Sequence, residues 1–203
     1  MNPQKVVDWG GLYIVAAIIF AESGLLVGFF FPGDSLLFLT GFFTSKPAGL
    51  PHIATPLPLV LLVLFAAATL GDQVGYLFGK RVGPALFKRE DSRLFKQAHV
   101  TKAHAFFDKY GAKTIVMCRF VPVVRTFAPI VAGVSAMRYR TFVMFNVIGA
   151  AIWAVGVTTL GFYLGKRPFI KNHIELSLIG IVVLSTIPII VEVLRHRRKT
   201  AAA

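Results

Sequence analysis

Four ionisable side chains lie inside stretches of the sequence that are otherwise almost entirely apolar. Two of them are acids, Glu22 and Asp34, and two are bases, Arg119 and Arg125. An ionisable group at bilayer depth costs about 2.5–3.5 kcal/mol on insertion scales, so such groups pair with one another or face a water-filled cavity. We therefore expect the two acids and the two arginines to meet at one buried site for substrate binding or proton coupling.

The chemistry that suits this set is recognition of a phosphate group. A guanidinium binds phosphate oxygens through two parallel hydrogen bonds, which a lysine ammonium does less well. The chain is expected to bend at Pro32–Ser35, where Asp34 can cap the helix that follows. A helix N-terminus favours an anion, and desolvated acids can take up protons. Buried ion pairs that only hold the segments together are the alternative.

Further residues are expected to shape this site. Prolines and glycines interrupt both charged segments and disfavour straight, lipid-facing helices there. Asp72 lies deep in another apolar run, where it either joins the charged network or marks a helix end near the membrane interface. The supporting positions are Pro32, Gly33, Asp72, Pro122, Pro129 and Gly133.

The composition is that of a membrane protein. Hydrophobic residues make up 56% of the 203 positions and the mean hydropathy is +0.70, above the values typical of soluble domains. The net charge of +13 comes from Lys and Arg that flank apolar runs, as on the cytoplasmic side of a membrane, so no nucleic-acid partner is expected. One cysteine, and histidines without ligand spacing, predict no metal and no cofactor.

We expect one all-α polytopic membrane domain that covers residues 1–203. The apolar runs Leu59–Phe78 and Phe142–Leu164 are long enough to cross a hydrocarbon core of about 30 Å. A final transmembrane helix is expected at residues 174–194. The basic tail at 195–203 then places the C-terminus in the cytoplasm.

Two other apolar segments are too interrupted to cross as single straight helices. Leu12–Phe31 ends at the Pro-Gly break, and the apolar piece that follows, Ser35–Phe43, is too short to span. Thr114–Ala136 contains two arginines and two prolines. Each segment is expected to form a re-entrant hairpin, although Leu12–Phe31 could also cross fully. Between them, apolar residues at helical spacing in the basic stretch 80–113 predict an amphipathic helix at the membrane surface.

The two halves of the sequence resemble each other. Gly75–Arg81 (GYLFGKR) matches Gly161–Arg167 (GFYLGKR), which gives repeats at about residues 12–81 and 114–167. Chance similarity of glycine-rich helix ends is the alternative. Lys and Arg favour the cytoplasmic side, and on this rule the two spans run in opposite directions, so the repeats are expected to be inverted. Lys166 and Arg167 then lie on the outer side, which is an exception to the rule. Inverted repeats with broken segments indicate a transporter whose site lies near the midplane.

Enzyme motifs are incomplete or absent in the sequence. Lys166-Arg167-Pro168 resembles a fragment of a lipid-phosphatase signature, but the Ser-Gly-His part is missing. The sequence has no Gly-x-Ser-x-Gly elbow, no His-Glu-x-x-His and no phosphate-binding Gly-Lys-Ser/Thr loop. We therefore expect a protein that is not an enzyme.

The motifs together resemble those of the DedA family of bacterial inner-membrane proteins. They follow the family's order along nearly the whole chain: Glu22-Ser-Gly, Phe31-Pro-Gly-Asp-Ser-Leu-Leu-Phe38, Gly71-Asp72, Arg119-Phe-Val-Pro-Val-Val-Arg125 and Asn146-Val-Ile-Gly149. The resemblance implies two opposed re-entrant hairpins, shared with eukaryotic VTT-domain lipid scramblases. It also implies that the four charged residues are the family's required acid and arginine pairs.

The resemblance further implies recycling of undecaprenyl phosphate across the inner membrane, with links to the proton motive force and envelope integrity. We therefore expect a flippase or scramblase for this or a related phospholipid, with protons as a further partner. A proton-coupled antiporter for small cations is the alternative, since it needs the acids but not the arginines. The sequence leaves open the substrate, the direction of transport and the oligomeric state, a homo-oligomer included.

Overall fold

The computed structural model describes residues 3–24, 33–46, 52–88 and 110–167. Every regular element in these ranges is helical, so the expected all-α architecture is confirmed there. In chain order the elements are α1 (Pro3–Gly24), α2 (Gly33–Thr44), α3 (Leu57–Lys88), α5 (Thr114–Cys118), α6 (Pro122–Val134), α7 (Tyr139–Ala150), the π-helical turn η2 (Ala151–Val155) and α8 (Gly156–Gly165).

Two of the described helices are long and apolar enough to cross a membrane. They are Leu57–Val82 within α3, and Tyr139–Gly165, in which α7, η2 and α8 follow without interruption. Both coincide with the spans that the apolar runs predicted. The final transmembrane helix at 174–194 and the tail at 195–203 lie outside the described residues. The re-entrant hairpins and the inverted repeat stay predictions.

The basic stretch after the first span begins as helix. We expected a separate polar segment from Lys80, but α3 continues to Lys88. Pro84 removes one backbone hydrogen bond, the one to the Lys80 carbonyl, but the helix continues past it to Lys88. Residues 89–109, which hold most of the expected amphipathic helix, lie outside the described residues.

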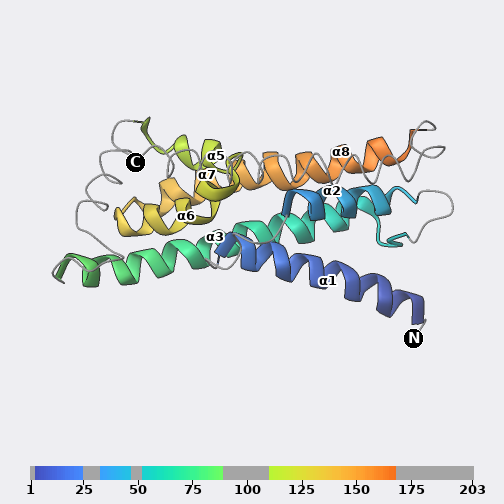
Figure 1. The fold of residues 1–203 in the computed structure, drawn as a ribbon, viewed down its shortest axis with the longest axis horizontal. Helices are drawn as coiled ribbons and strands as arrows, with labels where there is room; N and C mark the ends of the chain where they lie inside the picture. The colour runs from blue at the N-terminus through green and yellow to red at the C-terminus, as the bar shows by residue number, and fades with distance from the viewer. Residues whose placement is uncertain (1–2, 25–32, 47–51, 89–109, 168–203) are drawn as a thin grey trace, which may run out of the picture.

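The helices form an elongated bundle in which the two spans are antiparallel (Figure 1). In that view α3 runs from right to left, and the helix from α7 to α8 runs from left to right. The helix α1 starts at the right and ends near the middle, whereas α2 starts near the middle and returns to the right. The helix α6 also starts near the middle but runs to the left. Two helix N-termini therefore lie at the centre of the bundle.

The breaks that create these central N-termini have local causes. Gly33 opens α2, with Asp34 in its first turn. Pro122 opens α6, where its missing N–H is not needed, and the preceding Val121 is extended. The second proline of this segment, Pro129, lies inside α6, so the break falls before Pro122.

Glycines let the helices approach backbone to backbone. A Cβ on Gly41 of α2 would overlap the Thr158 carbonyl of α8, and one on Gly161 would overlap the Phe38 carbonyl. The same holds between α3 and α6, where a Cβ on Gly133 would overlap the carbonyl of Tyr76. Small residues allow such close contact between helices in membranes, and dispersion forces then hold the pairs together.

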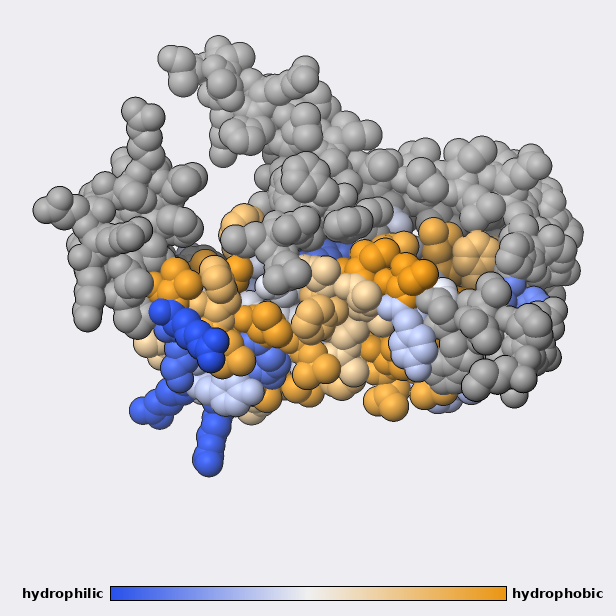
Figure 2. Space-filling view, turned by 90° about the horizontal axis from the view of Figure 1, so that it is seen from below, coloured by the Kyte–Doolittle hydropathy of each residue, from blue (hydrophilic) through white to orange (hydrophobic). Residues whose placement is uncertain are grey.

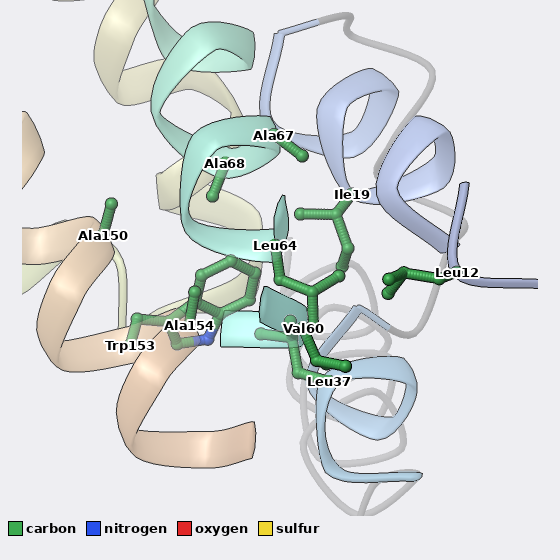
Figure 3. Close-up of a cluster of buried hydrophobic side chains, with 10 residues drawn as sticks. All are labelled: Leu12, Ile19, Leu37, Val60, Leu64, Ala67, Ala68, Ala150, Trp153 and Ala154. Carbon is green, nitrogen blue, oxygen red and sulfur yellow. The ribbon is translucent and has the colours of Figure 1, made fainter. Parts of the chain in front are cut away.

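The packed interior lies between α1, α2, α3 and the second span. Figure 3 shows its cluster of buried side chains, in which Ile19, Leu37 and Leu64 face Trp153 and the alanines around it. Large apolar side chains also point outward, as the orange surface of Figure 2 illustrates. Examples are Leu62, Leu70, Ile152 and Leu160, all in the two spans. An outward apolar surface along both spans fits a lipid environment.

Candidate functional site

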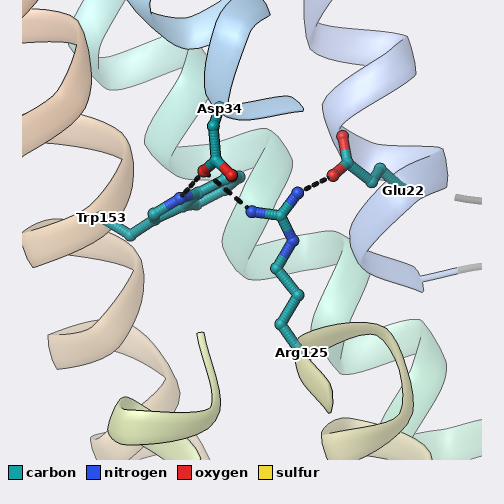
Figure 4. A network of polar contacts seen from close by, with 4 residues as sticks. All are labelled: Glu22, Asp34, Arg125 and Trp153. Atoms are coloured by element: carbon teal, nitrogen blue, oxygen red, sulfur yellow. Dashed lines mark hydrogen bonds and ion pairs between the residues drawn. The ribbon is translucent and has the colours of Figure 1, made fainter. Parts of the chain in front are cut away.

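Three of the expected charged residues meet where the central helix ends converge. Arg125, in the first turn of α6, donates from Nη2 to Glu22 Oε1 and from Nη1 to Asp34 Oδ1, the latter at 2.9 Å (Figure 4). The Glu22 side chain is 2% exposed and that of Arg125 10%, whereas that of Asp34 is 47% exposed. One arginine therefore serves both acids, and the site opens to its surroundings on the side of Asp34.

Trp153 completes this group from the second span. Its Nε1 donates to Asp34 Oδ1 at 2.6 Å, and its ring lies over Arg125, with the guanidinium carbon 4.7 Å from the ring centroid. The π-helical turn η2 contains Trp153, and such turns often mark functional positions because they displace a side chain from the regular helix face. Trp153 belongs to the expected span Phe142–Leu164, but it was not among the residues expected at the site. Tryptophan usually sits at membrane interfaces, so its place in mid-span was a usable signal.

The second arginine has different partners. Arg119 lies in the break between α5 and α6 and donates from Nη2 to Asp72 Oδ2 and to Asn146 Oδ1, the latter at 2.7 Å. Asn146 Nδ2 donates in turn to the Thr69 carbonyl at 3.2 Å. Arg119 is 5% exposed, and Asp72 and Asn146 are also buried. Asp72 thus joins the charged network and does not mark a helix end, because α3 continues well beyond it.

These contacts differ from the expected arrangement, in which Glu22 and Asp34 together face Arg119 and Arg125. Glu22 and Asp34 share Arg125, while Arg119 takes Asp72. The reason is positional, since Arg125 follows the break at the N-terminus of α6 and Arg119 precedes it beside α3. Trp153 connects the two groups, because the Arg119 guanidinium carbon also lies 5.7 Å from its ring centroid. The network holds three carboxyl groups against two guanidinium groups, so the ionised set carries one excess negative charge.

The supporting glycines and prolines act through backbone geometry. A Cβ on Gly33 would overlap the Glu22 carboxylate, so that carboxylate lies against the first turn of α2. We expected Asp34 to cap this helix, but α2 begins at Gly33 and Asp34 lies within its first turn. Pro129 touches α3, where a Cβ on Gly75 would lie 3.3 Å from Pro129 Cβ, and Gly133 also packs on α3. Pro122 sets the start of α6. Pro32 lies outside the described residues.

Another glycine, which we had not singled out for the site, makes room for Arg119. A Cβ on Gly149 would lie 3.1 Å from Arg119 Cδ and 3.2 Å from Arg119 Nε. Gly149 and Asn146 belong to one motif, Asn146-Val-Ile-Gly149, whose spacing puts both on one face of α7. The motif therefore builds the pocket for the arginine from one helix face.

Two atoms of the site are buried and have no hydrogen-bond partner within the described ranges. They are Glu22 Oε2, an acceptor, and Arg119 Nε, a donor. Buried polar atoms are nearly always paired, so unpaired ones at one site suggest groups that bind or release something. A carboxylate oxygen can accept a proton, and a guanidinium N–H can donate a hydrogen bond to an oxygen of an anion. Among the same residues, no three His, Cys, Asp or Glu side chains are grouped to hold a metal.

Comparison with known proteins gives one family. The family model of the VTT domain matches residues 31–163. The chain is 47% identical to an uncharacterized membrane protein of Mycobacterium tuberculosis over 91% of its own length and 79% of that protein. It is 41% identical to Protein DedA of Escherichia coli (94% and 85%) and 36% identical to Inner membrane protein YqjA of E. coli (86% and 76%). No solved structure matches.

Proposed function

The chain belongs to the VTT-domain family, which includes DedA and YqjA, and on that basis we propose that it transports a lipid with a phosphate headgroup across a membrane. The observation that carries the proposal is the buried pair of arginines at the centre of the bundle, held by three carboxyl groups and Trp153. We propose undecaprenyl phosphate as the lipid and a bacterial inner membrane as the location. In this role the protein moves its substrate unchanged and is not an enzyme.

The proposed architecture is an inverted repeat of two re-entrant hairpins, one made by α1 and α2 and the other by α5 and α6. It is supported by the course of the helices, since α2 and α6 leave the centre in opposite directions (Figure 1). The packing also supports it, because α2 packs on the span of the second half and α6 on the span of the first half, each through glycines. In this arrangement the charged site lies near the midplane, where transporters of this type bind substrate.

We propose that proton uptake and phosphate binding are coupled at Arg125. Both terminal nitrogens of its guanidinium donate to carboxylates, so a phosphate that takes both positions must displace a carboxylate. Protonation of Glu22 or Asp34 removes a negative charge and weakens its bond to the arginine. Because Asp34 is the exposed acid of the pair, it is the natural point of access for a headgroup. A proton would therefore promote binding of the phosphate that replaces the carboxylate.

A second candidate function is proton-coupled antiport of a small cation. The charge count favours it, because the three carboxyl groups exceed the two arginines by one negative charge that a proton or a cation can neutralise. This function needs the acids, but it requires only a positive charge at the arginines. The two candidates therefore differ in what they predict for an arginine-to-lysine change.

The experiment uses the full chain in proteoliposomes that contain a fluorescent polyprenyl phosphate, with leaflet exchange followed by dithionite quenching. Arg125→Lys is the test variant, and Arg140→Lys, at an exposed position on α7, is the matched control. We expect exchange with the wild type and the control, and a loss of at least about tenfold in Arg125→Lys because bidentate binding is lost. If wild-type protein exchanges no lipid but moves Na⁺ or K⁺ against protons in the same vesicles, the antiporter is correct and the lipid proposal is wrong.

A further inference from the structure

A pocket bordered by two lysines lies at the end of the bundle, away from the charged centre. It has a volume of about 330 Å³ and is formed by the end of α2, the start of α3 and the end of α8. Along α2, Thr44 is ten residue steps from Asp34, which separates the pocket from the central site by about 15 Å at 1.5 Å per residue. None of the central charged residues lines it.

Two lysines from different helices border this pocket. Lys46 follows the end of α2, and Lys166 follows the end of α8. Neither makes an ion pair with a described acid, and the Lys166 ammonium lies 4.1 Å from the ring centroid of Phe162, another lining residue. The pocket therefore combines positive charge without a counterion and an aromatic wall.

The backbone at Lys46 is unusual. Its φ is +56°, in the left-handed region that glycine adopts without cost and other residues rarely enter. A helix commonly ends on a glycine in this conformation, so the lysine here gives up stability that glycine would supply. Such a cost is tolerated where a side chain has a function, which points to the ammonium group.

A buried hydroxyl also faces this region without a partner. Thr55 lines the pocket, is 5% exposed, and its Oγ1 has no hydrogen bond to any residue that the structure describes. A buried hydroxyl without a partner is costly, and a ligand oxygen can satisfy it.

We propose that this pocket binds the phosphate group of an anionic lipid or a free phosphate ion, held by Lys46, Lys166 and the Thr55 hydroxyl. Two ammonium groups and a hydroxyl donor match the charge and oxygens of a phosphate. Ala54, Pro56, Leu57 and Phe162 supply the apolar part of the lining, which suits the first carbons of a lipid. In the proposed inverted topology, Lys166 lies on the side where the charge rule expects few basic residues, and this binding site gives a reason for it. The proposal is independent of what the central site transports.

The test measures binding at this pocket with a local reporter. A fluorophore on His52→Cys, in a Cys118→Ala background, reports the pocket because His52 is exposed and precedes its lining residues. The full chain is held in a maltoside detergent, which carries no phosphate. Short-chain phosphatidic acid and inorganic phosphate are titrated in separate arms. The test variants are Lys46→Gln, Lys166→Gln and the double variant that combines them. The control is Lys80→Gln, because Lys80 is the counterpart of Lys166 in the matching heptapeptide.

We expect a saturable signal that weakens by about tenfold for each lysine removed and stays unchanged in Lys80→Gln. A signal from the lipid alone identifies a headgroup site, and a signal from both probes identifies a site for phosphate itself. Lys46→Gly guards against misfolding, since it should raise thermal stability while it weakens binding. Equal affinity in the wild type and the double lysine variant, or no saturable signal from either probe, overturns the proposal. Because the reporter measures no transport, this result is separate from the test of the central site.

Discussion

Removal of the Arg125 charge should destabilise the protein mainly through Glu22. In Arg125→Gln, the Glu22 carboxylate stays 98% buried without a cation, while Asp34 can turn toward its surroundings from an exposed position. Loss of one partner of a buried ion pair costs about 3–5 kcal/mol, whereas exposed pairs contribute about 1 kcal/mol or less. We therefore expect a loss of about 3–5 kcal/mol in Arg125→Gln, most of it assigned to Glu22.

A double-mutant cycle assigns this energy. Glu22→Gln combined with Arg125→Gln removes both charges, so the double variant should be more stable than Arg125→Gln alone. We expect a coupling energy of about 2–3 kcal/mol for Glu22 with Arg125 and about 1 kcal/mol or less for Asp34 with Arg125. The assay is reversible unfolding in mixed micelles as the denaturing detergent increases, followed by circular dichroism.

The pH dependence of the single variant provides an internal check. A protonated Glu22 carries no charge, so the deficit of Arg125→Gln relative to wild type should shrink as the pH is lowered. Arg140→Gln, at an exposed position, should show neither the loss nor its pH dependence. Equal coupling energies for the two acids, or a deficit that does not change with pH, would refute the view that burial of Glu22 sets the cost.

Three further outcomes test the packing, the site and the topology. In thermal unfolding, Gly41→Val should lower the midpoint because the new side chain meets the backbone of α8. Gly156→Ala, whose Cβ meets nothing within 4 Å, should keep or raise the midpoint. Equal midpoints for the two variants would contradict the packing argument. Trp153→Phe keeps an aromatic ring but removes the hydrogen bond to Asp34. Lipid exchange should therefore fall severalfold, at a cost in stability of about 1 kcal/mol. Unchanged exchange would exclude the indole N–H from the mechanism. In a background without the native cysteine, a thiol reagent should label His52→Cys from outside the cell and Arg138→Cys only from the cytoplasm. Labelling of both positions from one side would rule out the proposed inverted topology.

Local sequence was sufficient for the two spans and for the identity of most of the charged residues. The spans followed from the length of their apolar runs, because a bilayer requires a fixed length of helix. The interruption within Thr114–Ala136 followed from proline chemistry, and the structure places it before Pro122. The charged residues stood out because a charge among apolar residues is costly wherever it lies, so their importance could be predicted without knowledge of their partners.

The partners themselves depend on how the helices cross. Arg125 and Glu22 are separated by 103 positions and Arg119 and Asp72 by 47, and nothing in the local sequence distinguishes these pairings from the alternatives. The choice is made by glycine contacts such as Gly133 on α3, which fix the rotation and depth of α6 and so determine which acid each arginine reaches. Trp153 and Asn146 likewise reach the site only through the packing of the second span against the other helices. The sequence by itself determined which groups had to be neutralised, because desolvation is a property of each residue. Only the tertiary structure decided which neighbour neutralises which, because hydrogen bonds and ion pairs depend on a few ångströms of distance between distant segments.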